Sequence, residues 1–472
     1  MENFTKQQRL ENITIESFAN EGKSLTRIGG KVIFVEGAVP GDVGDVIVYR
    51  NKRDFAEARL DKLITPSTFR VSPACSHFGV CGGCQWQHME YKQQLYYKQQ
   101  SVAETLKRLG KVEAEEVIPI AGATQIYNYR NKLEFTFSNK AWVPREELGN
   151  EAMRNQPALG FHIPGLFDKV LDVKKCHLQS EPSNYIRLAV RDYAIANQLE
   201  FFDLRQQTGF LRNLIIRSTS VGELMVVLSV AQPRQVIIDG IMNMLKKTFP
   251  EITSLNYTVN TKRNDTLYDQ DIICFSGKDH IVEELEGLKF RISPKSFFQT
   301  NSQQALNLYT IARQFAGLKS TDLVYDLYTG TGSIALFVSK YCKKVVGIES
   351  VPDAISDARK NADMNQISNC EFFVGDMKDA LSPDFVKING MPDVVITDPP
   401  RVGMHEDVVK NLLTMQPGKI VYVSCNPATQ ARDLQLLSEK YRIVKSQAVD
   451  MFPHTSHLEN VVLLTLKDKS SL

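Results

Sequence analysis

The stretch LVYDLYTGTGS, residues 323–333, combines a strand-like apolar run with a glycine-rich turn. A helix-like segment follows at 334–341, and a second strand-like run at 344–348 ends in Glu349. Three further strand-like runs lie at 371–374, 393–397 and 420–423. Strands that alternate with helices in this way are typical of a doubly wound α/β sheet. We therefore expect residues 290–472 to form a Rossmann-like domain.

Polar residues follow the expected strands, at the edge where open α/β sheets bind their ligands. Glu349 ends the second strand, and a carboxylate there can accept hydrogen bonds from both hydroxyls of a ribose. Asp376 follows the third strand, and Asp398, in the turn DPPR, follows the fourth. The glycine turn alone would suit a nicotinamide dinucleotide equally well. The Asp-Pro-Pro turn and a cysteine after the fifth strand favour S-adenosylmethionine, with its ribose beside Glu349.

The fifth strand leads into SCNPAT, residues 424–429. Cys425 therefore stands at the ligand-binding edge of the expected sheet and is a candidate nucleophile. A lone cysteine is more often a small buried apolar residue, so Cys425 by itself decides little.

The segment from residue 9 to about 65 is expected to be a small all-β module. Short strand-like runs, the best at 31–35 and 45–49, are separated by glycines and by the turn VPGD at 39–42. This spacing indicates a small OB-like barrel. Basic residues gather near its end (Arg50, Lys52, Arg53, Arg59 and Lys62). An ordinary solvated surface explains that charge as well as a nucleic-acid partner does.

A cysteine pattern, C-x5-C-x2-C, follows in the glycine-rich segment 73–88. Cys75, Cys81 and Cys84 are too close in sequence to favour disulfides and are good metal ligands, and Cys176 is the next cysteine along the chain. Four thiolates suit either a tetrahedral zinc ion or a 4Fe–4S cluster, and their spacing does not decide between the two.

The middle of the chain is expected to be an α+β domain. A helix-like segment at 91–108 carries an apolar seam (Leu95, Val102, Leu106 and Leu109) and ends near Gly110. Strand-like runs lie at 133–137, 214–217 and 224–228, and a helix is expected at 236–249. The cluster Arg130, Asn131 and Lys132 could hold a phosphate and a single-stranded base, although a solvated turn would have the same composition.

Length and composition limit the number of domains and the class of protein. A chain of 472 residues predicts two to four domains. The net charge of +2 does not by itself indicate a nucleic-acid partner, because basic residues can still gather on one face. No run of about 18 apolar residues is present, so we expect no membrane span. The polar first residues lack the apolar core of a secretory signal, which predicts a cytoplasmic protein. Monomer is the default expectation.

Five motifs together resemble a known family. They are CSHFGVCGGC at 75–84, FFQTN at 297–301, DPPR at 398–401, SCNPAT at 424–429 and PHTSHLE at 453–459. The chain resembles the S-adenosylmethionine-dependent RNA uracil-5-methyltransferases, specifically the 23S rRNA branch with a TRAM domain and an iron–sulfur cluster. The resemblance covers nearly the whole chain. It implies a TRAM β-barrel at 1–66, a central iron–sulfur domain at 67–289, from which the helix near 91–110 would pack on the catalytic domain, and a methyltransferase domain at 290–472.

The resemblance also implies a role for each motif residue. Cys425 would be the nucleophile, Glu459 the general base, and Asp398 would lie between the cofactor and the base. A 4Fe–4S cluster would be held by Cys75, Cys81, Cys84 and Cys176. The S-adenosylmethionine site would be lined by Gln299, Tyr328, Gly330, Ser333, Glu349, Asp376 and Asp398. The barrel and the group Arg130, Asn131 and Lys132 would contact RNA.

The chemistry needs these residue types. Carbon 5 of uracil is too weak a nucleophile to take a methyl group unless a thiolate first adds to carbon 6. A base must then remove the hydrogen on carbon 5 before the thiolate leaves. The target uridine must also be taken out of the RNA stack.

Competing functions need overlapping sets of residues. A tRNA uridine-5 methyltransferase would need the same ones. An RNA cytosine-5 methyltransferase would be expected to carry a cysteine where Pro400 and Arg401 stand. An exocyclic-amine methyltransferase would not need Cys425, and a non-catalytic RNA-binding protein would need neither Cys425 nor Glu459.

Overall fold

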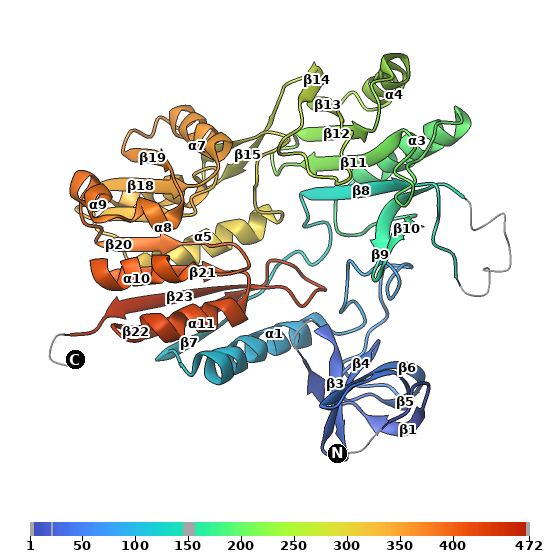
Figure 1. The fold of residues 1–472 in the computed structure, drawn as a ribbon, viewed down its shortest axis with the longest axis horizontal. Helices are drawn as coiled ribbons and strands as arrows, with labels where there is room; N and C mark the ends of the chain where they lie inside the picture. Colours follow the sequence, from blue (N-terminus) through green and yellow to red (C-terminus); the bar gives the residue numbers. More distant parts are fainter. Residues whose placement is uncertain (1–3, 20–21, 145–155, 469–472) are drawn as a thin grey trace.

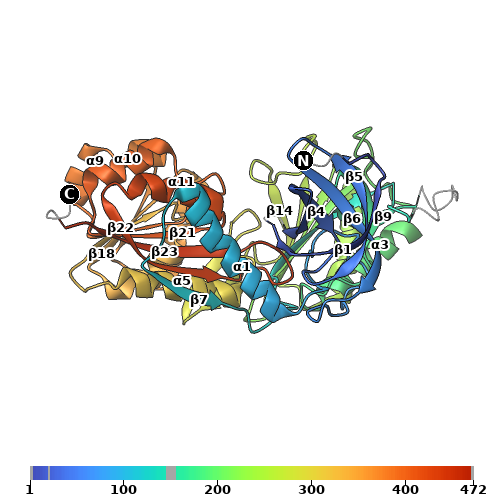
Figure 2. The same cartoon turned by 90° about the horizontal axis from the view of Figure 1, so that it is seen from below.

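The computed structural model describes residues 4–19, 22–144 and 156–468. Figure 1 shows three layered parts: a small β module at the N-terminus, a central sheet with two helices, and a large C-terminal α/β part. Figure 2 shows the helix α1 (Tyr91–Thr105) crossing between the N-terminal module and the C-terminal part.

The N-terminal module is a curved sheet in the order β1-β5-β6-β4-β3-β2. Its strands are β1 (Arg9–Thr14), β2 (Ser17–Phe18), β3 (Ser24–Ile28), β4 (Lys31–Glu36), β5 (Val43–Asn51) and β6 (Phe55–Thr65). Alternate residues of β4 and β5, among them Ile33, Val35, Val46 and Val48, are fully buried in one cluster. This alternation, with the opposite side chains facing outward, is what a half-buried strand requires.

The central part is a sheet in the order β10-β9-β8-β11-β12-β13-β14. Its strands are β8 (Lys132–Ser138), β9 (Ala158–Ile163), β10 (Leu166–Asp172), β11 (Leu211–Ser218), β12 (Leu224–Val230), β13 (Ser254–Val259) and β14 (Ile272–Gly277). Helices α3 (Ser183–Ala196) and α4 (Gln235–Thr248) pack on it through Ile186, Val190, Ile238 and Met242. The strands and the helix expected here from the sequence are present.

The C-terminal part is a sheet in the order β19-β18-β17-β20-β21-β23-β22-β7. Its strands are β17 (Leu323–Leu327), β18 (Lys344–Glu349), β19 (Cys370–Val374), β20 (Val394–Thr397), β21 (Lys419–Ser424), β22 (Tyr441–Val449), β23 (Glu459–Leu466) and β7 (Glu116–Ala121). The strands from β19 to β21 are parallel, and β23 is antiparallel to both of its neighbours. Parallel strands joined by helices are the arrangement that the alternating sequence pattern predicts.

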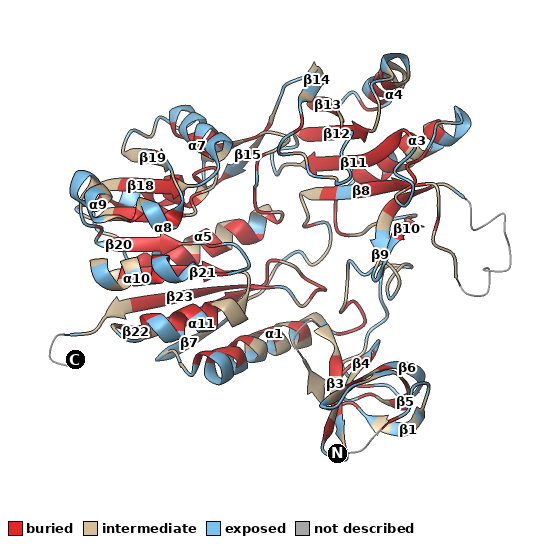
Figure 3. Ribbon diagram, in the orientation of Figure 1, coloured by how far each residue is buried: buried red, intermediate tan, exposed pale blue. Residues whose placement is uncertain are grey.

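Helices cover both faces of this sheet, and the strands are therefore apolar on both sides. The helices are α5 (Ser302–Ala316), α6 (Ser333–Val338), η4 (Ser339–Tyr341), α7 (Pro352–Met364), α8 (Met377–Ala380), α9 (Pro383–Asn389), α10 (Glu406–Met415) and α11 (Pro427–Leu437). Val324 faces the cluster that contains α5 and α7, whereas the next residue, Tyr325, faces the cluster that contains α10 and α11. Figure 3 shows the inner strands of this sheet mostly in red, whereas the edge strand β19 is only partly buried. A hairpin of β15 (Ile281–Leu285) and β16 (Leu288–Ile292) packs against α6 and α7.

The segment 91–121 departs from the predicted division of the chain. Helix α1 continues as the π-helical turn η2 (Leu106–Gly110), and η2 packs on α11. Strand β7 pairs with β22 and so extends the C-terminal sheet, although the division at 67–289 assigns it to the central domain. The predicted seam is partly wrong, because Leu109 is 55% exposed while Gln94 and Lys98 are buried. A π turn holds more residues than an α turn, which rotates Leu109 away from the face of Val102 and Leu106.

Candidate active site

The sheet order brings the predicted active-site residues to one edge. Asp398 follows β20, and Cys425 follows β21, its parallel neighbour. Strand β23 is antiparallel to β21, with Asn460 opposite Ser424, so the first residue of β23, Glu459, lies beside the last residues of β21. Residues far apart in the sequence are thereby placed next to one another.

The turn after β17 is tightly constrained. Tyr328, Gly330 and Gly332 all have positive φ, and a side chain at Gly332 would come within 3.1 Å of Ala358 and Phe372. The amide of Gly330 donates to Glu349 Oε2 at 3.2 Å, while Ser350 and Val351 donate to Glu349 Oε1. Glycine is needed here both for the backbone conformation and for the close approach to neighbouring side chains.

Buried acidic groups surround this turn. Burial raises the pKa of Asp326 to about 7, although Thr329 and the amide of Ala335 donate to its Oδ2. Burial and the Asp326 charge raise the pKa of Asp398 to about 7 as well. Burial, and then Asp398, raise the pKa of Glu459 well above its usual range. Among the described residues, Asp326 Oδ1 and Glu459 Oε2 are buried and have no hydrogen-bond partner. Such a group of carboxyls favours a cationic ligand or a bound proton.

The thiol of Cys425 lies beside the same acids. Burial, and then Glu459 and Asp398, raise its pKa to about 11, so only about 0.1% of it is thiolate at pH 8. Asn426 caps α11 by accepting from Ala428 at 3.1 Å, which places Cys425 just before a helix N-terminus. The helix dipole and any bound cation would favour the thiolate.

Arg401 is a neighbour that the sequence reasoning did not single out, although it lies within the motif DPPR. Its carbonyl accepts from Asn426 Nδ2 at 3.0 Å and from Thr429 Oγ1 at 3.2 Å, which ties the turns after β20 and β21 together. Its guanidinium lowers the pKa of both Cys425 and Glu459. The positive charge of Arg401 therefore favours the thiolate form of Cys425.

Tyr309 on α5 was also missed. Its hydroxyl lies 3.1 Å from Ser333 Oγ. Burial raises the pKa of Tyr309 above its usual range, and the charges of Asp398, Asp326 and Glu459 act against its ionisation in addition. The sequence of α5 does not identify Tyr309 as a site residue, because a tyrosine on the apolar face of a helix is usually an ordinary core residue.

Of the remaining predicted cofactor residues, Tyr328 and Asp376 lie near Glu349, and Gln299 lies beside Asn131. Burial raises the pKa of Tyr328 to about 12, and neighbouring acids, Asp376 and Glu349 among them, add to the effect. Asp376 caps α8 and its side chain is 60% exposed. Gln299 is buried, and its carbonyl accepts from Asn131 Nδ2 at 2.9 Å.

The predicted RNA group therefore contacts the segment 299–302. The amide of Asn131 donates to Thr300, and its side chain also donates to Ser302. Burial lowers the pKa of Lys132, which is half-buried. Arg130 lies over the ring of Phe452, with its guanidinium 5.8 Å from the ring centre. Asn131 thus holds the 299–302 segment in place.

The four predicted metal-ligating cysteines lie close together. Cys75, Cys81 and Cys84 come from one loop, and Cys176 comes from a separate segment of the central part. Burial, and then charges on the other thiols of the group, raise the pKa of Cys84 to about 12 and that of Cys176 to about 11. A side chain at Gly82 would come within 2.3 Å of Pro164, so the loop between the thiols needs glycine. In the described part of the chain, no group of three or more His, Cys, Asp or Glu side chains has the arrangement of a single-ion site.

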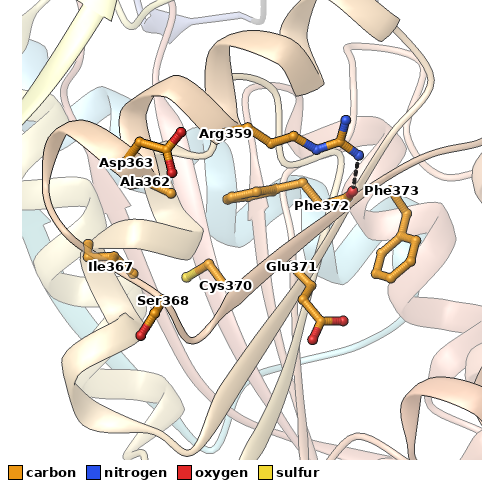
Figure 4. A pocket seen from close by; sticks show the side chains of 9 residues that line it. All are labelled: Arg359, Ala362, Asp363, Ile367, Ser368, Cys370, Glu371, Phe372 and Phe373. Carbon is orange, nitrogen blue, oxygen red and sulfur yellow. Dashed lines mark hydrogen bonds between the residues drawn. The ribbon is translucent and has the colours of Figure 1, made fainter.

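A separate pocket lies between α7 and β19 (Figure 4) and is lined by Arg359, Ala362, Asp363, Ile367, Ser368, Cys370, Glu371, Phe372 and Phe373. Arg359 donates to the carbonyl of Phe372 at 2.7 Å. None of the predicted site residues lines it. It adjoins the candidate site through Phe372, which a side chain at Gly332 or Gly347 would meet, and through Cys370, whose thiol lies near enough to Asp326 for that charge to raise its pKa.

Comparisons with known proteins agree with this arrangement. Residues 269–467 match the family model described as tRNA (uracil-5-)-methyltransferase. An RNA methyltransferase of Bacteroides thetaiotaomicron is 54% identical over 95% of this chain and 100% of its own length. Another, of Chlorobaculum tepidum, is 38% identical over 95% of each chain.

The chain belongs to the S-adenosylmethionine-dependent RNA uracil-5-methyltransferase family.

A solved structure shares the whole fold of this family member. The Pyrococcus abyssi tRNA (uracil-54, C5)-methyltransferase, in complex with S-adenosyl-L-homocysteine, superposes with a TM-score of 0.74 at 29% identity, over 96% of this chain and 100% of its own. The predictions of a Rossmann-like fold, of S-adenosylmethionine as methyl donor and of an RNA substrate are confirmed at this level. No helix among the described residues is long and apolar enough to cross a membrane.

Proposed function

We propose that this enzyme methylates carbon 5 of a uridine in 23S rRNA through a covalent bond between Cys425 and carbon 6 of the base. The thiolate adds to carbon 6, which makes carbon 5 an enolate carbon that takes the methyl group from the sulfonium. S-adenosylhomocysteine leaves, Glu459 removes the proton from carbon 5, and the carbon 6–sulfur bond breaks to restore the double bond and the thiolate.

The observation that carries this proposal is the mutual influence of Cys425, Asp398 and Glu459. Each of the two acids raises the pKa of the thiol, and all three groups lie at one edge of the sheet. A carboxyl whose pKa is raised well above its usual range is a stronger base once it has ionised, as proton removal from carbon 5 requires.

The cofactor is proposed to lie over the glycine turn. Glu349 would accept from the ribose, and Asp376 would lie at the adenosine end. The methionyl part would pass Gln299, Tyr328, Gly330 and Ser333, which brings the sulfonium near Asp398. The unpaired acidic oxygens of the site support a cationic ligand there.

The RNA is proposed to contact the N-terminal module, as a TRAM barrel, and Arg130 beside the site. Asn131 and Lys132 would act mainly by holding this segment, since both are engaged with or buried in protein. The second candidate substrate is tRNA, because the matching family model and the superposed structure are both named for tRNA enzymes.

A 4Fe–4S cluster is proposed at Cys75, Cys81, Cys84 and Cys176. The donor set fits, because four thiols gather around a glycine loop and would be relieved of mutual repulsion by a cation. The cluster would supply structure, since methyl transfer has no redox step. Anaerobic reconstitution followed by optical and electron paramagnetic resonance spectra tests this, and stoichiometric zinc without iron would contradict it.

Two experiments test the function. Purified enzyme, labelled cofactor and total RNA from a strain that lacks the gene should give 5-methyluridine in 23S rRNA, whereas label in tRNA alone would establish the second candidate. RNA containing 5-fluorouridine should form a stable adduct with the wild-type enzyme and none with Cys425→Ala. An adduct that survives this substitution would refute the nucleophile assignment.

A further inference from the structure

The segment 450–458, here called the base loop, joins β22 to β23 and ends directly before Glu459. Most of it is buried, and His454 has a positive φ of 67°, which a residue with a side chain adopts only when its surroundings impose it. The Oε2 of Glu459 has no hydrogen-bond partner among the described residues, so no hydrogen bond holds this oxygen in place. The base loop and the start of β23 must therefore set where this carboxyl points.

Lys98 on α1 contacts the base loop through three hydrogen bonds. Its ammonium group donates to Asp450 Oδ1 at 2.5 Å, to the carbonyl of His457 at 2.8 Å and to that of Phe452 at 3.1 Å. All three ammonium hydrogens are thus used within one loop. The side chains of Lys98 and Asp450 are both fully buried.

Asp450 completes this centre. Its Oδ2 accepts from the Tyr91 hydroxyl at 2.8 Å, and its Oδ1 also accepts from the amide of Phe452 at 3.1 Å. The ion pair therefore links both ends of the base loop to α1: Asp450 at one end and His457, two residues before Glu459, at the other.

The cysteine loop holds the middle of the base loop. The amides of Gln85 and Trp86, which directly follow Cys84, donate to the carbonyl of His454 at 2.7 and 3.0 Å. Gln94 accepts from the amide of His454 at 2.9 Å. The base loop is thus braced by elements that come before residue 100, far from the catalytic domain in sequence.

A buried ion pair is a poor source of stability, because desolvation of both charges offsets most of their attraction. What such a pair does well is to exclude alternative geometries, since any other arrangement leaves a buried charge unpaired. All the hydrogen bonds that Lys98 donates go to the base loop, so the geometry that the ion pair selects is the conformation of the base loop.

We propose that Lys98 and Asp450 are positioning residues that aim Glu459 at carbon 5 of the methylated uracil. This inference rests on the proposed function, in which Glu459 is the base. It predicts a selective defect: bond formation at Cys425 and methyl transfer proceed, whereas proton removal from carbon 5, and with it the release of the sulfur, is slowed.

The variant Lys98→Met/Asp450→Asn tests this, because it removes both charges together and leaves none unpaired. On 5-fluorouridine RNA, where carbon 5 carries no removable proton, the variant should form the adduct within about twofold of the wild-type rate, since these steps do not use the base. On ordinary RNA it should turn over at least tenfold more slowly and accumulate a methylated covalent complex, visible as a shifted band on a denaturing gel.

Two further variants make the outcome decisive. Lys107→Met, an exposed lysine on the adjoining η2, should behave as the wild type. Glu459→Gln should accumulate the same complex, and if it does not, the proposed base is wrong whatever the double variant does. If Glu459→Gln accumulates the complex and the double variant does not, the positioning proposal fails.

A purely structural role has a different signature. A double variant that loses adduct formation on 5-fluorouridine RNA, cofactor binding and turnover in equal proportion would overturn the proposal. Should the double variant not fold, Tyr91→Phe replaces it, because it keeps both buried charges paired and removes only the hydrogen bond to Asp450 Oδ2. The selective accumulation is expected there to a smaller extent, and a uniform loss would again overturn the proposal.

Discussion

The buried carboxyls of the active site predict that the affinity for S-adenosylmethionine depends on pH while that for S-adenosylhomocysteine does not. Asp326 and Asp398 have pKa values raised to about 7, mainly by burial, and so are largely protonated below that pH when no cofactor is bound. The sulfonium of S-adenosylmethionine carries a positive charge that favours their ionised form, whereas the thioether of S-adenosylhomocysteine does not.

The magnitude follows from the pKa. If one carboxyl with a pKa of about 7 must ionise, the affinity for S-adenosylmethionine falls about 25-fold between pH 7.5 and pH 5.5. At pH 6.5 such a group is about three-quarters protonated, so binding releases about 0.75 proton. The affinity for S-adenosylhomocysteine should change by less than about threefold over the same range, because no ionisation is required.

Isothermal titration calorimetry in buffers of different ionisation enthalpy measures both quantities. The α-amino group of either ligand, with a pKa near 8, remains charged at pH 6.5 and contributes little. With Asp398 as that carboxyl, because it is proposed to lie beside the sulfonium, the variant Asp398→Asn should remove nearly all of the proton release. Equal pH dependence for the two ligands, with no proton release, would refute the assignment of these acids to the sulfonium.

Three other predictions concern single residues. Arg401→Met should raise the pKa of Cys425 further, which lowers the thiolate fraction, so adduct formation on 5-fluorouridine RNA at pH 8 should slow severalfold. An unchanged rate beside the control Lys410→Met would contradict this. Gly332→Ala should cost about 1–2 kcal/mol of unfolding free energy from its φ of 80° and more from contact with Ala358. Gly30→Ala, with a φ of 77° and nothing within 4 Å, should show the backbone cost alone in thermal unfolding, and equal losses would exclude the contact. Cys84→Ser should lower the iron content on reconstitution. It should also lower the midpoint of thermal unfolding, because the adjacent residue Gln85 holds the base loop. A variant that binds the full amount of iron would show that Cys84 is not a ligand.

The strand-end residues were predictable because they depend on chain order. Alternating strands and helices place Glu349, Asp398 and Cys425 at one edge of a parallel sheet, whatever the details of packing. The motif containing Glu459 identified that residue, but only the antiparallel pairing of β23 with β21 explains why it lies next to Cys425.

Other features depend on tertiary contacts that no local pattern encodes. Lys98 reads as a solvated helix residue, yet it is fully buried because its charge is met by Asp450, more than 300 positions away. Leu109 reads as part of an apolar seam, yet the π turn exposes it. Strand β7 lies more than 300 positions before its partner β22, so no local pattern assigns it to the C-terminal sheet.

The most direct test of the central claim is to locate the bond between enzyme and RNA. Trypsin cleaves after Lys419 and Arg432, which isolates a peptide, residues 420–432, whose single cysteine is Cys425. After reaction with S-adenosylmethionine and 5-fluorouridine RNA, nuclease treatment and tandem mass spectrometry, this peptide should carry a methylated fluorouridine nucleotide on Cys425. Attachment at any other residue, or methylated RNA with no attached peptide, would contradict the account.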